Sequence, residues 1–142
     1  MIKKILVATD GSDHATKGIE FASDLAQKYK ATVYLIHVVT PLSSMPEIDG
    51  GLLQQWEDIH EKQATEILEK AESVVKKKGV ENYQATLLRG DPAQEIIEFA
   101  RKNSVDMIVM GSRGAGKLEM LMLGSVSNKV CHLADCSCVT IK

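Results

Sequence analysis

The chain has 142 residues and a formal net charge of −2, with 44% hydrophobic and 25% charged residues. This composition is ordinary for a globular protein, and the length suits one domain, 1–142, with a core that needs no disulfide staples. The near-neutral charge gives no basic footprint for nucleic acid, and no apolar run approaches the roughly 20 residues of a membrane span. We therefore expect neither a nucleic-acid partner nor a membrane partner.

The N-terminus combines lysines with apolar residues, as a secretory signal does. Its apolar run ends at Thr9, before the loop cluster Asp10-Gly11-Ser12, and is too short for a signal peptide. We interpret 2–9 as a β-strand and expect a cytoplasmic protein.

Apolar patterns predict alternating helices and strands along the first half of the chain. Helical spacing over 13–29 indicates one helix, and 32–39 is a continuous apolar strand. Residues 40–51 hold two prolines and two glycines and are expected to form a connection. A long amphipathic helix over 52–75 stops at three lysines and Gly79, which are typical C-terminal signals. The apolar residues that mark this helix are Leu52, Leu53, Trp56, Ile59, Ile67, Leu68, Ala71, Val74 and Val75.

The second half repeats the alternation. A third strand covers 83–88, and Asp91-Pro92 suits the N-cap and first position of the next helix. A fourth strand covers 106–110, a short helix covers 125–134 with Leu133 inward, and a last strand covers 138–141.

The order β-α-β-α-β-α-β-α-β, with strands apolar on both faces, predicts a parallel sheet covered by helices on both sides. We therefore expect an α/β, three-layer, doubly wound, Rossmann-like fold with five parallel strands. Such sheets bind ligands beyond the carboxyl ends of the strands, where the strand order reverses. In the order 3-2-1-4-5, Asp10 after the first strand meets Gly111 after the fourth.

Four glycines lie between Gly111 and Gly124, directly after the fourth strand. Glycine lets backbone N–H groups approach a phosphate closely, although a surface loop is the alternative interpretation. The Walker A spacing matches as far as Lys117, but Leu118 stands where Ser or Thr should hold Mg²⁺. A dinucleotide fingerprint fails because Glu119 occupies the place of its third glycine.

A different spacing, G-x2-G-x9-G-[S/T], is formed by Gly111, Gly114, Gly124 and Ser125. It resembles the nucleotide motif of the ATP-binding branch of the universal stress protein family. The likeness extends over essentially the whole chain, from the opening strand and its acidic loop to the fourth strand. The resemblance implies the adenine nucleotide alpha hydrolase-like variety of the fold, with ATP, AMP or another adenine nucleotide as ligand.

The resemblance also implies roles for matched positions. Backbone N–H groups of 111–114 and 124–127 would line the phosphates, with hydroxyl donors at Ser125 and Ser127. Arg113 would offer charge-assisted bonds to phosphate, Asp10 would reach the ribose hydroxyls or a Mg²⁺-bound phosphate, and the main chain of Val38 would read the adenine edge. The complete expected nucleotide-binding set is Ala8, Thr9, Asp10, Val38, Met110, Gly111, Ser112, Arg113, Gly114, Gly124, Ser125, Val126 and Ser127.

The residues alone leave alternatives open at three of these positions. Arg113 also suits a solvated loop, Asp10 suits a turn or an N-cap, and the side chain of Val38 indicates only a buried strand.

In the family, the last strand pairs with its mate across a dimer axis, which implies a homodimer through 138–142. The chain departs from the family pattern because Ser137 stands where a proline usually precedes this strand.

The three cysteines are crowded near the C-terminus, which gives no disulfide framework. Together with His132 they fit no standard zinc spacing, so we interpret them as buried or half-buried thiols, with a metal site as the weaker alternative. They are Cys131, Cys136 and Cys138.

No histidine neighbours a Ser or Cys in a recognisable nucleophile arrangement, and His37 is expected to be a satisfied core residue. Asp10, with Asp13 as a second candidate, offers the carboxylate nearest the proposed phosphates. Three hypotheses follow, and none assigns a catalytic residue. They are an ATP-binding regulatory module whose nucleotide state alters its dimer or partners, a slow Mg²⁺-dependent ATPase, and a nucleotide-independent scaffold. The intact glycine spacing argues against the scaffold.

Overall fold

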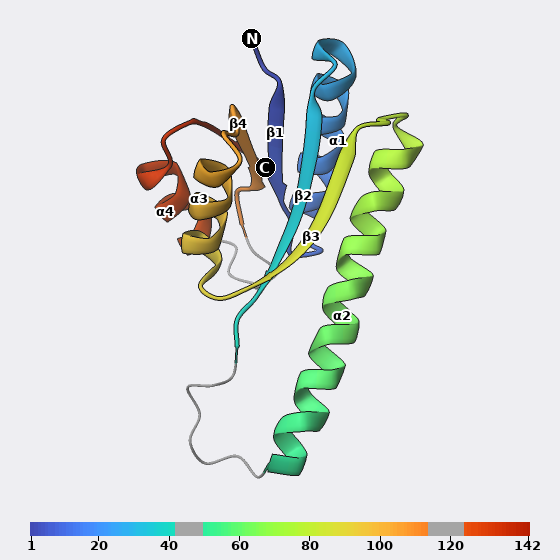
Figure 1. Ribbon diagram of the computed structural model, residues 1–142, viewed down its shortest axis with the longest axis vertical. Coiled ribbons are helices and arrows are strands. Elements are labelled where there is room, and N and C mark those ends of the chain that lie inside the picture. The colour runs from blue at the N-terminus through green and yellow to red at the C-terminus, as the bar shows by residue number, and fades with distance from the viewer. Residues whose placement is uncertain (42–49, 114–123) are drawn as a thin grey trace.

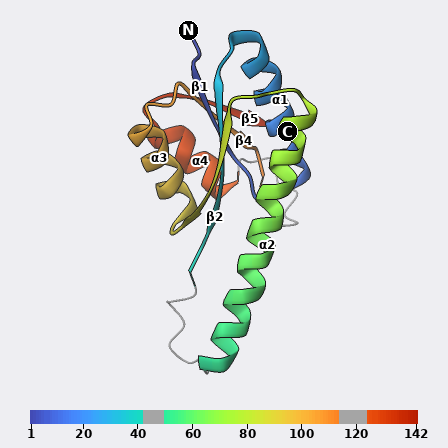
Figure 2. The same ribbon diagram turned by 45° about the vertical axis from the view of Figure 1, so that its right-hand side comes forward.

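Five parallel strands form one sheet in the order β3-β2-β1-β4-β5, as the sequence predicts (Figures 1 and 2). The structure is a computed structural model and describes residues 1–41, 50–113 and 124–142. Its elements are β1 (Lys4–Ala8), α1 (Asp13–Tyr29), β2 (Thr32–Val39), α2 (Gly50–Lys77), β3 (Tyr83–Arg89), α3 (Pro92–Lys102), β4 (Met107–Gly111), α4 (Ser125–Leu133) and β5 (Ser137–Ile141).

Helices cover both faces of the sheet, so the strands carry apolar residues on both sides. α1 and α2 pack on one face, and α3 and α4 pack on the other (Figures 1 and 2). Successive residues of a strand point to opposite faces. Ile5 and Val7 of β1 thus enter the core under α1 and α2, while Leu6 enters the core under α3. All three are fully buried.

The first strand leads into α1 through a side-chain cap, and a second cap opens α3. Ser12 Oγ accepts the Ala15 N–H at 3.2 Å, and the Asp91 carboxylate accepts the Gln94 N–H at 3.0 Å. Each cap satisfies an N–H that has no partner inside its helix. The predicted cap at Asp91, with Pro92 in the first turn, is confirmed.

The expected connection 40–51 ends earlier than predicted, because α2 already begins at Gly50. Residues 42–49 lie outside the described residues. The two glycines occupy the first turn of α2, where N–H groups lack intrahelical partners and weak helix formers are tolerated best. At about 1.5 Å per residue, the 28 residues of α2 exceed the length of any strand of the sheet.

The first half of α2 therefore projects past the sheet (Figure 1). Its buried residues start at Ala64, whereas Leu52 is 60% and Ile59 is 56% exposed. The predicted helix is confirmed, but these two residues of its apolar stripe do not reach the core, since the described structure places no strand beneath them. The prediction that Leu133 faces inward is also wrong, since this last residue of α4 is 54% exposed. Tyr29, at the last position of α1, is exposed as well.

Candidate functional site

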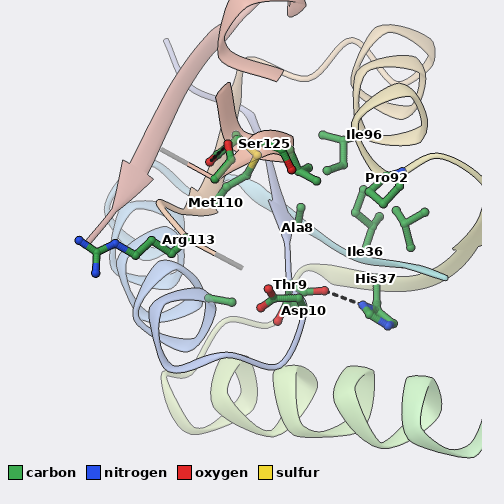
Figure 3. Close-up of a pocket in the computed structure, with 16 residues that line it drawn as sticks. Ala8, Thr9, Asp10, Ile36, His37, Pro92, Ile96, Met110, Arg113 and Ser125 are labelled. Carbon is green, nitrogen blue, oxygen red and sulfur yellow. Dashed lines mark hydrogen bonds between the residues drawn. The ribbon is translucent and has the colours of Figure 1, made fainter. Parts of the chain in front are cut away.

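A cavity of about 200 Å³ opens at the carboxyl edge of the sheet, where the strand order reverses between β1 and β4 (Figure 3). This is the place where doubly wound sheets bind their ligands. Eleven of the thirteen residues predicted for the nucleotide site line it, and Ser112 lies buried directly behind it. The lining residues are Ala8, Thr9, Asp10, Ala15, Ile36, His37, Val38, Pro92, Ile96, Met110, Gly111, Arg113, Gly124, Ser125, Val126 and Ser127.

One end of the cavity is apolar. Ala8, Ile36 and Met110 come from three strands, and Pro92 and Ile96 come from the first turns of α3. A flat apolar group such as a nucleobase suits this end. Sequence reasoning missed Ile36, Pro92 and Ile96, although the start of the helix after β3 must lie at the same edge as the ends of the strands.

The Asp10 loop combines a turn with a free acceptor. Asp10 Oδ1 accepts the Ser12 N–H at 2.9 Å, and Thr9 Oγ1 accepts the Gly11 N–H at 3.2 Å. Asp10 nevertheless lines the cavity, and the hydrogen bond from the Ser12 N–H occupies only one of its two carboxylate oxygens. The turn interpretation of Asp10 is therefore confirmed, and this turn leaves the second carboxylate oxygen free of the Ser12 bond.

His37 is satisfied, as expected, but it lies at the cavity and not in the core. Its Nδ1 is 2.7 Å from the carbonyl oxygen of Thr9 (Figure 3). A carbonyl only accepts, so Nδ1 carries the hydrogen of this bond. A histidine at the end of an otherwise apolar strand was the signal for this position.

The main chain of Val38 faces the gap that opens beside β2 where β1 ends. Ala8 pairs with Ile36, and the Thr9 N–H donates to the Ile36 carbonyl at 2.9 Å. In a parallel ladder, every second residue directs both N–H and C=O to the same neighbour. Val38 therefore directs its groups toward β1, which has already turned away, and no described residue pairs with them.

Gly111 allows α1 to approach the end of β4. A Cβ at this position would lie 3.0 Å from His14 Cβ and 3.1 Å from the Ala15 nitrogen. The glycine thus has a packing reason, in addition to the predicted role toward phosphate.

Ser112 joins three elements behind the cavity and is 4% exposed. Its N–H donates to the Ile141 carbonyl and its carbonyl accepts the Gly124 N–H, each at 2.7 Å. The Ser127 hydroxyl also donates to the Ser112 carbonyl, at 3.3 Å, and His14 Nδ1 lies 3.4 Å from Ser112 Oγ. The Ser112 N–H is therefore engaged inside the protein, unlike the expectation that the N–H groups of 111–114 all line the phosphates.

The N-terminus of α4 brings N–H groups to the cavity. Its N-cap is Gly124, which has no side chain to satisfy the first turn. The N–H groups of Ser125, Val126 and Ser127 have no acceptor among the described residues, and all three residues line the cavity. Free N–H groups and the helix dipole make this end attractive to anions. The Ser127 hydroxyl is shared between the Gly124 and Ser112 carbonyls, which leaves Ser125 as the hydroxyl donor of this turn.

Comparison with known proteins identifies the family of this chain. The sequence profile of the universal stress protein family matches residues 1–142. The chain belongs to the universal stress protein family. The universal stress protein MJ0531 of Methanocaldococcus jannaschii is 37% identical over 147 residues, which cover 100% of this chain and 83% of that protein.

Solved universal stress proteins share the fold over nearly the whole chain. UspA of Lactobacillus plantarum aligns with a TM-score of 0.89 at 23% identity, covering 99% of this chain and 98% of its own. The protein of Archaeoglobus fulgidus, solved in complex with dAMP, aligns with a TM-score of 0.72 at 27% identity, covering 100% of this chain and 98% of its own.

Among the described residues that line the cavity of this universal stress protein, Arg113 carries a positive charge. It lines the cavity, and its guanidinium extends away from Pro92 and His37 (Figure 3). Gly114, the predicted neighbour in the motif, lies outside the described residues, as do Gly116 and Lys117 of the Walker A-like spacing.

The three cysteines are free and half-buried, and they lie apart from the cavity. Burial, followed by the charges of Cys131 and Cys136, raises the pKa of Cys138 to about 12. Burial also raises the pKa of Cys136. Within 1–41, 50–113 and 124–142, no three His, Cys, Asp or Glu side chains are grouped to hold a metal ion. None of the helices described is both long and apolar enough to cross a membrane.

Proposed function

We propose that this universal stress protein binds ATP as a homodimeric regulatory module, with the adenine at the apolar end of the cavity. The observation that carries the proposal is the main chain of Val38 beside that end, which no described residue pairs with on the β1 side. Its N–H suits the N1 acceptor of adenine and its C=O suits the 6-amino donor. Guanine presents a hydrogen on N1 and an oxygen at C6, so the same pair opposes it.

The polar end of the cavity supports the nucleotide assignment. Three N–H groups of α4 suit phosphate oxygens, with Ser125 and Arg113 as further donors. Asp10 keeps an oxygen either for the ribose hydroxyls or for a Mg²⁺-bound phosphate. The dAMP complex of the A. fulgidus relative, 27% identical to this chain, supports an adenine nucleotide as ligand.

Mg²⁺ would arrive with the nucleotide, in our proposal. Proteins commonly hold this ion through one or two carboxylates together with substrate phosphates, and Asp10 is the carboxylate of the cavity lining. Bound Mg²⁺ would neutralise phosphate charge, and Asp10 would orient that end of the ligand. The cytoplasm remains the compartment that we propose, since free thiols suit a reducing environment.

The dimer would form through β5, which lies at the edge of the sheet. The Ile141 carbonyl accepts the Ser112 N–H, so alternate residues of β5 face β4. Cys138 and Thr140 therefore direct their main-chain groups outward. Phe21 on α1, 37% exposed, adds apolar surface for a partner.

The test begins with the purified protein, which is heat-denatured so that any released nucleotide can be identified. Titration calorimetry and thermal unfolding then compare ATP with GTP, each with Mg²⁺. At 100 times Kd, ATP stabilises by about 2.7 kcal/mol, or roughly 5–10 °C for a chain of this size. If no nucleotide is released and added ATP leaves Tm unchanged, the proposal is wrong. ATP that stays intact for hours supports the binding module, whereas ADP formation that is lost in Asp10→Asn supports the ATPase.

A further inference from the structure

The strands β1 and β2 separate abruptly at Thr9. The ladder is regular up to the bond from the Thr9 N–H to the Ile36 carbonyl. If the same register continued, the Val38 N–H would donate to the Thr9 carbonyl, and the Gly11 N–H would donate to the Val38 carbonyl. Neither bond exists between these described residues.

Two side chains occupy the groups that the ladder would have used. His37 Nδ1 donates to the Thr9 carbonyl at 2.7 Å, which takes the acceptor away from Val38. Thr9 Oγ1 accepts the Gly11 N–H at 3.2 Å, which takes the donor away from Val38. Thr9 is 5% exposed, so its carbonyl and hydroxyl depend on protein partners and not on bulk water.

We propose that His37 and Thr9 are positioning residues that replace two ladder bonds and so keep the Val38 main chain free to read the base. The inference rests on the proposed function, because it explains how the adenine-reading edge stays open. A gap between two adjacent central strands readily closes by further pairing, because buried N–H and C=O groups need hydrogen-bond partners. The two side chains remove those partners in advance.

A leucine at position 37 has a volume similar to that of histidine but leaves the Thr9 carbonyl without a donor. The nearest donor in register is then the Val38 N–H, so β1 and β2 should pair one step further. An asparagine places its amide nitrogen close to the position of Nδ1 and can keep the bond. His37→Leu and His37→Asn are therefore a matched pair.

The first measurement needs no ligand. Amide hydrogen exchange by NMR compares the Val38 N–H with the Ile36 N–H, which the ladder predicts to be bonded to β1. In the wild type, we expect Val38 to exchange about 100-fold faster than Ile36. In His37→Leu the difference should shrink at least tenfold, and in His37→Asn it should persist. Equal protection of both amides in the wild type, or unchanged Val38 exchange in His37→Leu, overturns the inference.

The second measurement uses ATP and its 1-deaza analogue, in which N1 of the base is a C–H group. Wild type and His37→Asn should prefer ATP by about tenfold, whereas His37→Leu should bind both equally. If the bond from His37 to Thr9 merely stabilised the loop, His37→Leu would lower the affinity for both ligands by the same factor. That result would contradict the inference. If His37→Leu fails to fold, Thr9→Val provides the corresponding test, because it returns the Gly11 N–H to the Val38 carbonyl. Should the protein bind no adenine nucleotide, the proposed function fails, and the exchange measurement still decides the role of His37.

Discussion

The carbonyl oxygen of Ser112 accepts the backbone N–H of Gly124 at 2.7 Å. This bond joins the end of β4 to the N-cap of α4, so the two halves of the glycine motif meet behind the cavity. The Ser127 hydroxyl reinforces the contact from inside the helix. The direction in which α4 points its free N–H groups therefore depends on the end of β4.

Val38→Pro tests the main-chain contact to the base. Proline lacks an N–H, and the Val38 N–H faces the gap and not β3, so the sheet loses no ladder bond. We expect the variant to fold with a similar Tm and to bind ATP at least tenfold more weakly by calorimetry. Val38→Ile keeps the N–H and is the control. Unchanged ATP affinity in Val38→Pro would place the base elsewhere.

Gly111→Ala should destabilise the protein through packing. The new Cβ would lie 3.0–3.2 Å from main-chain and Cβ atoms of His14 and Ala15, which cannot move without shifting α1. We expect a loss of about 1–3 kcal/mol in the free energy of unfolding, measured with urea. Gly50→Ala, which meets nothing within 4 Å, should be neutral or stabilising. Equal stability of the two variants would contradict this account.

Thr140→Pro probes the proposed dimer. Its main-chain N–H points away from β4, so proline leaves the β4–β5 ladder intact but removes a donor at the free edge. We expect a monomer in sedimentation analysis, with the fold retained in circular dichroism. Thr140→Val should remain dimeric. A dimer that survives the proline uses another surface.

Asp106 contributes a pH dependence to stability. The N–H groups of Lys3 and Lys4 donate to its Oδ2 at 2.8 and 2.9 Å, and these bonds lower its pKa below the ordinary 3.8. Because the folded-state pKa is the lower one, the stabilisation is fully present above the ordinary pKa of 3.8 and is lost at lower pH, as the pH falls through the folded-state pKa. Asp106→Asn should therefore cost roughly 0.5 kcal/mol at pH 7, a small amount since the group is exposed, and less than that at pH 3. Urea unfolding at both pH values measures this, with Glu69→Gln on the exposed face of α2 as the control. A deficit as large at pH 3 as at pH 7 would contradict this assignment.

Cys138 should resist alkylation in the folded protein. With its pKa at about 12 against an ordinary 9.0, the reactive thiolate is about a thousandfold scarcer at pH 8 than in the unfolded chain. Iodoacetamide labelling followed by tandem mass spectrometry should find Cys138 unmodified in buffer and modified in urea. Rapid labelling in buffer would mean that the thiol is not buried as described.

The strand order and the meeting of Asp10 with Gly111 could be predicted from the sequence, since apolar strands alternate regularly with helices and parallel strands align their carboxyl ends. The engagement of the Ser112 N–H with Ile141 could not, because it depends on where β5 ends relative to β4. His37 was misjudged for a related reason. Its spacing indicates a strand. Its imidazole can bond to the Thr9 carbonyl only because β1 leaves the sheet at that point. The exposure of Leu52 and Ile59 also escaped prediction, since an amphipathic pattern does not reveal where the sheet beneath it stops.

The projecting half of α2 decides what optical measurements on this protein report. The single tryptophan, Trp56, lies there, stacked on His60 with ring centroids 3.5 Å apart and far along the helix from the first buried residue, Ala64. Intrinsic fluorescence will therefore report the unfolding of this projecting half of α2, while far-ultraviolet circular dichroism reports the unfolding of the whole domain. We expect the two transitions to separate in urea, so an unfolding curve from fluorescence alone will understate the stability of the domain.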